Sequence, residues 1–176
     1  MIQSVFDRND AIHILNEMCV NLPSHKYDVG QKVISELCSK LIEQITAQHF
    51  TKKMQSPVTA GVHDTDPDVY FHNLQKPLEI KVAMTGGNRL RWRGGGLTDR
   101  ACDYLFIARN RDSTEFFAAL CHMQKSDWVL QKTQYFAPYF TETMLFDKNP
   151  KVLLGSFGVS TRGKNKGSPI LVLEKL

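Results

Sequence analysis

Two apolar runs dominate the middle of the chain and limit what it can fold into. Residues 102–108 and 115–121 are almost continuously hydrophobic, and only the polar stretch 109–113 separates them. Runs of this length without alternation are typical of strands that are covered on both faces. We therefore predict two central strands that need helices or further strands on either side.

Helical periodicity in the first fifty residues supplies such cover. Apolar residues recur at helical spacing over residues 9–22, and Pro23 ends the pattern. Asp28 and Gln31 resemble a capping box ahead of a longer helix, which runs to about residue 45. Helices alternating with strands in this way predict an α/β fold with a mixed central β-sheet flanked by helices.

A short antiparallel meander is predicted between the helices and the central strands. Residues 58–62 alternate as a half-buried strand does, and residues 69–71 resume extended structure after a turn at 66–67. Residues 78–83 follow a second turn and form the third strand.

The third strand of this meander carries charged side chains on one face. A period of two places Glu79 and Lys81 on one face and the apolar residues of the strand on the other. Asp68 lies at the head of the preceding strand and adds a second carboxylate. Carboxylates beside an ammonium group can hold a divalent metal and activate a water molecule. The alternative is a structural ion pair between Glu79 and Lys81, which would contribute little to stability.

A glycine- and arginine-rich stretch follows directly, at residues 85–96. Glycine allows a backbone to approach another molecule closely, and arginine suits phosphates and base edges. We interpret the stretch as a loop that contacts nucleic acid through Asn88, Arg89, Arg91, Trp92 and Arg93. The alternative is a surface loop with a partly buried Trp92.

A second basic loop lies near the C-terminus, where Arg162, Lys164 and Lys166 alternate with glycine and asparagine. It could touch a phosphate backbone, and a plain solvated turn is the alternative.

Length and composition favour one folded domain. A chain of 176 residues is long enough for one well-buried core. We divide it into a helical part at 1–50, a catalytic sheet at 56–121 and a C-terminal extension at 122–176. The net charge of +4 permits an anionic partner. The widely spaced residues Cys19, Cys38, Cys102 and Cys121 are expected to be buried free thiols, and with no signal-peptide pattern a cytoplasmic location is expected.

The residues of the meander resemble the signature of the PD-(D/E)xK nuclease superfamily. Pro67-Asp68 is followed after ten residues by Glu79-Ile80-Lys81 within an apolar strand, and an arginine-rich glycine segment comes next. The chain is also similar in size to small type II restriction endonucleases. The resemblance covers roughly residues 29–121.

This resemblance implies a set of roles. Asp68 and Glu79 would bind Mg²⁺, with Mn²⁺ as a substitute and the Ile80 carbonyl as a further oxygen ligand. Lys81 would orient the attacking water and stabilise its hydroxide form. Mg²⁺ is suited to such a site because it takes one or two carboxylates and keeps several waters.

Other acidic residues are weaker metal candidates. Asp64 and Asp66 could assist Asp68, although both also suit a solvated turn. On the longer helix, Glu36, Lys40 and Glu43 share a face that we interpret as solvated, with Glu36 kept as a weak candidate for an additional carboxylate. The histidines at positions 63 and 72 are expected to be surface or hydrogen-bonded residues, because no His-rich metal set surrounds them.

The function expected from these features is Mg²⁺-dependent hydrolysis of DNA phosphodiester bonds. The leading hypothesis is a sequence-specific type II restriction endonuclease that cuts double-stranded DNA as a homodimer. A structure-selective resolvase or a repair nuclease with the same metal site is an alternative. A DNA-binding module without catalysis is another.

Overall fold

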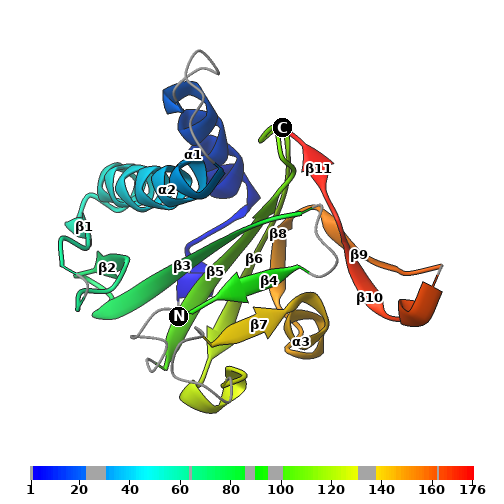
Figure 1. Cartoon of the computed structure of the whole chain (residues 1–176). Helices are drawn as coiled ribbons and strands as arrows, with labels where there is room; N and C mark the ends of the chain where they lie inside the picture. The colour runs from blue at the N-terminus through cyan, green and yellow to red at the C-terminus, as the bar shows by residue number, and fades with distance from the viewer. Residues whose placement is uncertain are drawn as a thin grey trace.

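The computed structural model describes residues 2–22, 31–63, 65–85, 90–94, 101–130, 138–161 and 163–176. These residues form an α/β fold in which two N-terminal helices pack on a mixed seven-stranded sheet (Figure 1). The helices are α1 (Arg8–Asn21), α2 (Gln31–Met54) and α3 (Glu142–Asp147), with short 3₁₀ turns at Ile2–Ser4, Lys125–Asp127 and Gly163–Asn165. The strands are β1 (Val58–Ala60), β2 (Val69–Phe71), β3 (Lys76–Met84), β4 (Arg91–Arg93), β5 (Cys102–Arg109), β6 (Glu115–Met123), β7 (Tyr139–Thr141), β8 (Lys151–Leu154), β9 (Ser156–Val159), β10 (Pro169–Val172) and β11 (Glu174–Lys175).

The large sheet has the strand order β1-β2-β3-β5-β6-β11, and β8 also pairs with β6. Strands β1, β2 and β3 form the expected antiparallel meander. Strands β3 and β5 are parallel, which requires the long crossover between them. The two apolar runs are β5 and β6, both internal strands, as predicted. Strand β3 lies between β2 and β5, so its charged residues are not on a sheet edge.

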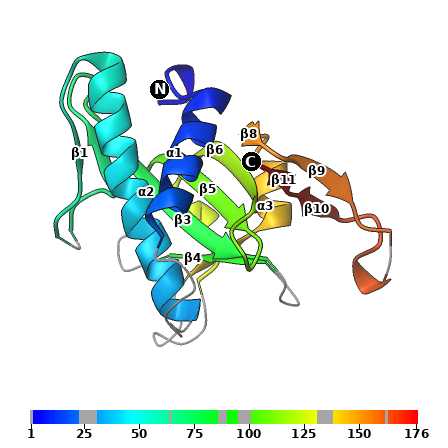
Figure 2. The ribbon, with the colours of Figure 1, turned by 90° about the horizontal axis from the view of Figure 1, so that it is seen from above.

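Each face of the sheet packs against a different layer (Figure 2). On one face, Ile80 and Ile107 pack beneath α1 and α2 in the larger apolar core. On the other face, Phe106 packs with Trp92 and Phe140, which come from the two-stranded β4–β7 ribbon. The alternation along β3 therefore separates its apolar face from the face that carries Glu79 and Lys81.

The prediction of a loop at 85–96 is wrong at its centre, where Arg91–Arg93 forms strand β4 paired with β7. The physical reason is Trp92. Its ring is fully buried against Phe106 at a centroid distance of 5.1 Å, and its indole N–H donates to the Ile107 carbonyl at 2.8 Å. Burial of this ring fixes the backbone on either side as a strand.

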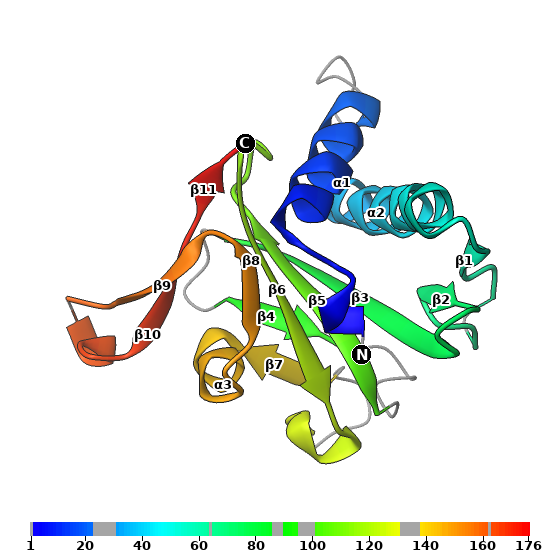
Figure 3. The ribbon, with the colours of Figure 1, turned by 180° about the vertical axis from the view of Figure 1, so that it is seen from behind.

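Strands β9 and β10 form a separate two-stranded ribbon that extends away from the main sheet (Figure 3). Three of the cysteines (Cys38, Cys102 and Cys121) are buried and Cys19 is half-buried, and all four are free thiols. No helix within the described ranges is long and apolar enough to cross a membrane.

Candidate active site

Asp68, Glu79 and Lys81 meet in the structure as the sequence spacing predicted. The Lys81 Nζ lies 3.2 Å from Asp68 Oδ2 and 3.1 Å from Glu79 Oε2. Glu79 is buried, and the other two side chains are mostly buried. An ammonium group thus bridges two carboxylates that come from different strands.

The strand register explains why these groups meet. Val69 pairs with Leu78, so the next position back along β2, Asp68, lies beside Glu79. The Gly61 N–H donates to the Asp68 carbonyl, which continues the pairing of β1 with β2 past the end of the strands. Asp68 Oδ2 also accepts a hydrogen bond from the Ile80 N–H at 2.7 Å. The main chain of β3 therefore fixes the carboxylate of Asp68.

Lys81 remains a charged group in this environment. Burial alone would favour the neutral amine, but the negative charges of Asp68 and Glu79 outweigh burial and raise the pKa of Lys81 above its ordinary value. The ammonium also lies 5.8 Å from the centre of the Tyr104 ring. The Tyr104 hydroxyl, in contrast, stays neutral, because burial and the nearby negative charges raise its pKa.

The oxygen atoms at this position suit a hard divalent cation. Asp68 and Glu79 supply two carboxylates, which is the number that Mg²⁺ ordinarily takes from a protein. The N–H and C=O groups of one strand residue point to the same side, so the Ile80 carbonyl is directed to the edge where its N–H meets Asp68. Within the described ranges, no group of three or more His, Cys, Asp or Glu side chains is arranged to hold a metal. The oxygen donors that this position could offer a cation are therefore two carboxylates and one carbonyl.

Glu43 is a third carboxylate near this site, and the sequence did not indicate it. The expectation of a solvated side chain is wrong for Glu43, which is only 3% exposed although Lys40 beside it is solvated. Burial raises its pKa, the hydrogen bond from Lys40 at 2.7 Å opposes that shift, and the charge of Asp68 adds to it. The charges of Asp68 and Lys81 reach Glu43 because α2 packs against β3. Helical periodicity could place Glu43 on a face, but not show that the sheet covers this face.

The structure does not add Glu36 or Asp66 to this donor set. Glu36 is exposed and lies two helical turns from Glu43, about 10 Å along the axis. Asp66 holds a turn, because its Oδ2 accepts hydrogen bonds from the Val62 N–H at 3.1 Å and the His63 N–H at 2.9 Å. Asp64 lies outside the described residues. The histidines meet the expectation, since His63 is exposed and a ring nitrogen of His72 is hydrogen-bonded to the Thr59 hydroxyl.

The predicted DNA-contacting residues fall into three groups: accessible, buried and outside the described residues. Arg93 is exposed, and the Arg91 guanidinium lies 4.4 Å from the centre of the Tyr139 ring. Trp92 is not retained as a contact, because its buried ring cannot reach another molecule in this structure. Lys166 is exposed next to the turn at the end of the β9–β10 ribbon. Asn88, Arg89 and Arg162 lie outside the described residues, as does the side chain of Lys164.

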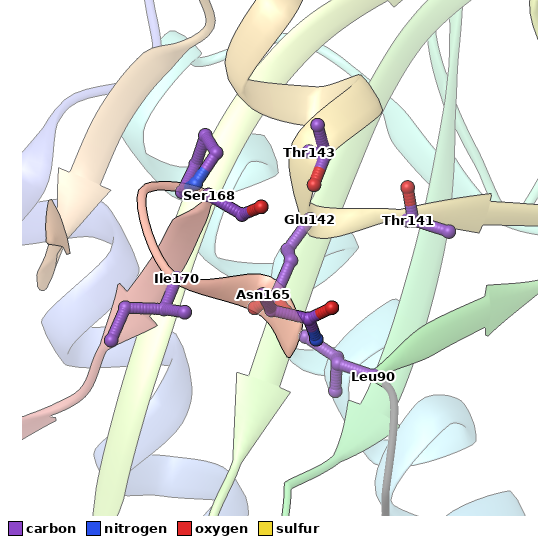
Figure 4. Close-up of a pocket in the computed structure, with 8 residues that line it drawn as sticks. Leu90, Thr141, Glu142, Thr143, Asn165, Ser168 and Ile170 are labelled. Atoms are coloured by element: carbon purple, nitrogen blue, oxygen red, sulfur yellow. The ribbon is translucent and has the colours of Figure 1, made fainter. Parts of the chain in front are cut away.

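A hollow of about 230 Å³ lies between the β7–α3 junction and the turn end of the β9–β10 ribbon, and it contains none of the predicted catalytic residues (Figure 4). Thr141, Glu142 and Thr143 line it from the β7–α3 junction, and Asn165, Ser168 and Ile170 line it from the opposite side. Burial raises the pKa of Glu142, whose carboxylate accepts a hydrogen bond from the Leu171 N–H at 3.3 Å. This contact ties β10 to α3, so we assign Glu142 a structural role.

Comparison with known proteins adds no assignment to this geometry. No protein-family model matches the chain, and no curated protein matches it.

Proposed function

We propose that this protein is a Mg²⁺-dependent DNA endonuclease that hydrolyses phosphodiester bonds. The observation that carries the proposal is the position of Lys81, whose ammonium contacts the carboxylates of Asp68 and Glu79 on the internal strand β3. This arrangement fits the PD-(D/E)xK pattern of residues 67–81.

Asp68, Glu79 and the Ile80 carbonyl would hold the metal. When bound, Mg²⁺ supplies positive charge that polarises the scissile phosphate and lowers the pKa of a water molecule. The hydrogen bond from Ile80 keeps Asp68 in place before the metal binds. Preorganisation of this kind reduces the cost of assembling the site around its substrate.

We assign Lys81 the role of a hydrogen-bond donor and a positive charge. The negative charges of Asp68 and Glu79 outweigh burial and raise the pKa of Lys81, which favours the ammonium form. The ammonium can orient the attacking water and stabilise the hydroxide as the proton leaves. Its two carboxylate contacts fix it at the position where the phosphate must bind.

The proposed substrate is double-stranded DNA, and the proposed enzyme is of the site-specific type II class. Arg91, Arg93 and Lys166 offer positive charge to phosphates or base edges. A palindromic site is cut on both strands when two identical catalytic sites are related by a twofold axis. We therefore propose a homodimer as the active unit.

The test is cleavage of a mixed-sequence supercoiled plasmid by the purified protein with and without Mg²⁺. We expect discrete fragments that require the metal. Lys81→Ala and Glu79→Ala should each lower the cleavage rate by at least ~10²-fold, the scale of a positioned catalytic group. Lys76→Ala is the matched control, because Lys76 is an exposed lysine on the same strand. This variant should cleave DNA at the wild-type rate.

The outcomes separate the candidate functions. Unchanged cleavage by both variants would rule out this catalytic site. Cutting confined to branched DNA would favour a resolvase, and DNA binding without metal-dependent cutting would favour a non-catalytic module.

A further inference from the structure

A second hollow, of about 350 Å³, lies beside the proposed catalytic site where the chain leaves β1 and returns in β2. Its walls include Thr59, Val62, Asp66, Pro67 and Tyr70. This volume is at the lower end of the range for small-ligand pockets. Thr59 and Tyr70 have no part in the proposed hydrolysis, so that reaction does not account for the hollow.

The hollow and the catalytic carboxylates are on one face of the sheet. Tyr70 follows Asp68 by two residues, and side chains two apart along a strand point to the same face. Tyr70 pairs with Pro77 on β3, and Pro77 precedes Glu79 by two residues. A strand rise of about 3.3 Å per residue places Tyr70 roughly 7 Å along the strand from Asp68. That distance is similar to the spacing between neighbouring nucleotides, so Tyr70 is placed about one nucleotide away from a phosphate bound at Lys81.

The ring of Tyr70 is held in place as a wall of this hollow. It is half-buried and meets the His72 ring edge-on, with centroids 5.0 Å apart and an interplanar angle of 87°. The Nε2 of His72 is hydrogen-bonded to the Thr59 hydroxyl at 3.0 Å. Thr59 is in turn the cross-strand partner of Tyr70. This set fixes the aromatic ring without a ligand, which lowers the entropy cost of binding against it.

The walls favour a flat uncharged group over a phosphate. Tyr70, Pro67 and Val62 offer apolar surface, and the Asp66 carboxylate is negative. No lysine or arginine is among the described residues that line the hollow. A phosphate would be repelled here, whereas an uncharged nucleobase can stack on the aromatic ring of Tyr70.

We propose that this hollow binds the nucleobase of the nucleotide next to the scissile phosphate, with Tyr70 as the stacking group. The inference rests on the proposed function, because it takes Lys81 and the carboxylates as the position of the phosphate. The base must leave its stack in the duplex to enter the hollow, as in enzymes that extrude a base into a pocket. Stacking on Tyr70 then offsets part of the cost of unstacking.

The test is a binding cycle on a duplex oligonucleotide that carries a cleavage site mapped in the plasmid assay. Dissociation constants are measured by fluorescence anisotropy without divalent metal, for the intact duplex and for duplexes with an abasic nucleotide on either side of the cut. Tyr70→Leu should weaken binding of the intact duplex by ~10-fold, the scale of one lost base–aromatic stack. It should leave binding of one abasic duplex unchanged, because that duplex has no base for Tyr70 to hold.

Two variants control for effects on folding. Tyr70→Phe keeps the ring and should bind like the wild type. Phe146→Leu changes a partly exposed aromatic residue on α3, away from the hollow, and should not alter binding. An equal effect of Tyr70→Leu on intact and abasic duplexes, or no effect on either, would overturn the base pocket and leave the nuclease proposal standing. A wild-type protein that cuts no DNA would remove the proposed function and this inference together.

Discussion

The N–H of Ile80 donates a hydrogen bond of 2.7 Å to Asp68 Oδ2. The same oxygen lies 3.2 Å from the ammonium of Lys81. One carboxylate atom therefore joins the backbone of β3 to the charged groups of the proposed site. Stability and activity should respond differently to substitutions at Asp68, depending on whether the acceptor or the charge is removed.

Asp68→Asn and Asp68→Ala separate these two roles. Asparagine keeps an acceptor for the Ile80 N–H and removes only one of the two carboxylates beside Lys81, so the free energy of unfolding should fall less than in the alanine variant. Alanine leaves that N–H without its partner and should lower the free energy of unfolding by ~1–3 kcal/mol. Urea denaturation measures both variants.

Both Asp68 variants should lose activity. Each removes a carboxylate from the proposed metal site, so we expect the Mg²⁺ concentration for half-maximal cleavage to rise by at least ~10-fold. A stable Asp68→Asn variant with a wild-type Mg²⁺ requirement would exclude Asp68 as a ligand.

Strand β4 gives a second prediction, because its residues divide into buried and accessible ones. Arg91→Ala and Arg93→Ala should each reduce the steepness of the salt dependence of DNA binding by about 0.9 in log–log slope if the residue contacts one phosphate. Trp92→Phe should leave this slope unchanged. It should instead lower the free energy of unfolding by ~1–3 kcal/mol, because it removes the donor to the Ile107 carbonyl and part of a buried ring. A change in the salt slope for Trp92→Phe would contradict its position in the core.

Much of the sheet follows from local periodicity. Strands β5 and β6 have long apolar sequences because both faces are covered, and the alternation in β3 reflects one apolar and one charged face. The meeting of Asp68 with Glu79 and Lys81 was also predictable, since a short meander leaves few registers that bury Val69 and Phe71.

Other features depend on contacts between elements distant in the sequence. Glu43 has the same helical phase as the exposed Glu36, and only packing of α2 on β3 distinguishes the two. Trp92 lies among arginines and glycines in the sequence, and its burial requires the partner strand β7, about fifty residues later. Propensity and pattern carry no information on such pairings.

Glu43 gives a third prediction, through the pH dependence of stability. Burial raises the pKa of Glu43, so the folded state binds its proton more tightly than the unfolded state does. The free energy of unfolding must then fall as pH rises from the unfolded value near 4.5 through the higher folded value. Glu43→Gln has the shape of the protonated carboxyl and no titration, so it removes this decline. Its free energy of unfolding should be close to the wild-type value at acid pH and exceed it increasingly over that window, apart from the small effect of losing the exposed Lys40 partner. Chemical denaturation at a series of pH values measures the difference. Glu36→Gln is the matched control on the same helix face. Its free energy of unfolding should vary with pH in parallel with that of the wild type, because Glu36 is exposed.

Parallel pH profiles of the free energy of unfolding for Glu43→Gln and the wild type would show that the buried carboxyl is not destabilised by ionisation.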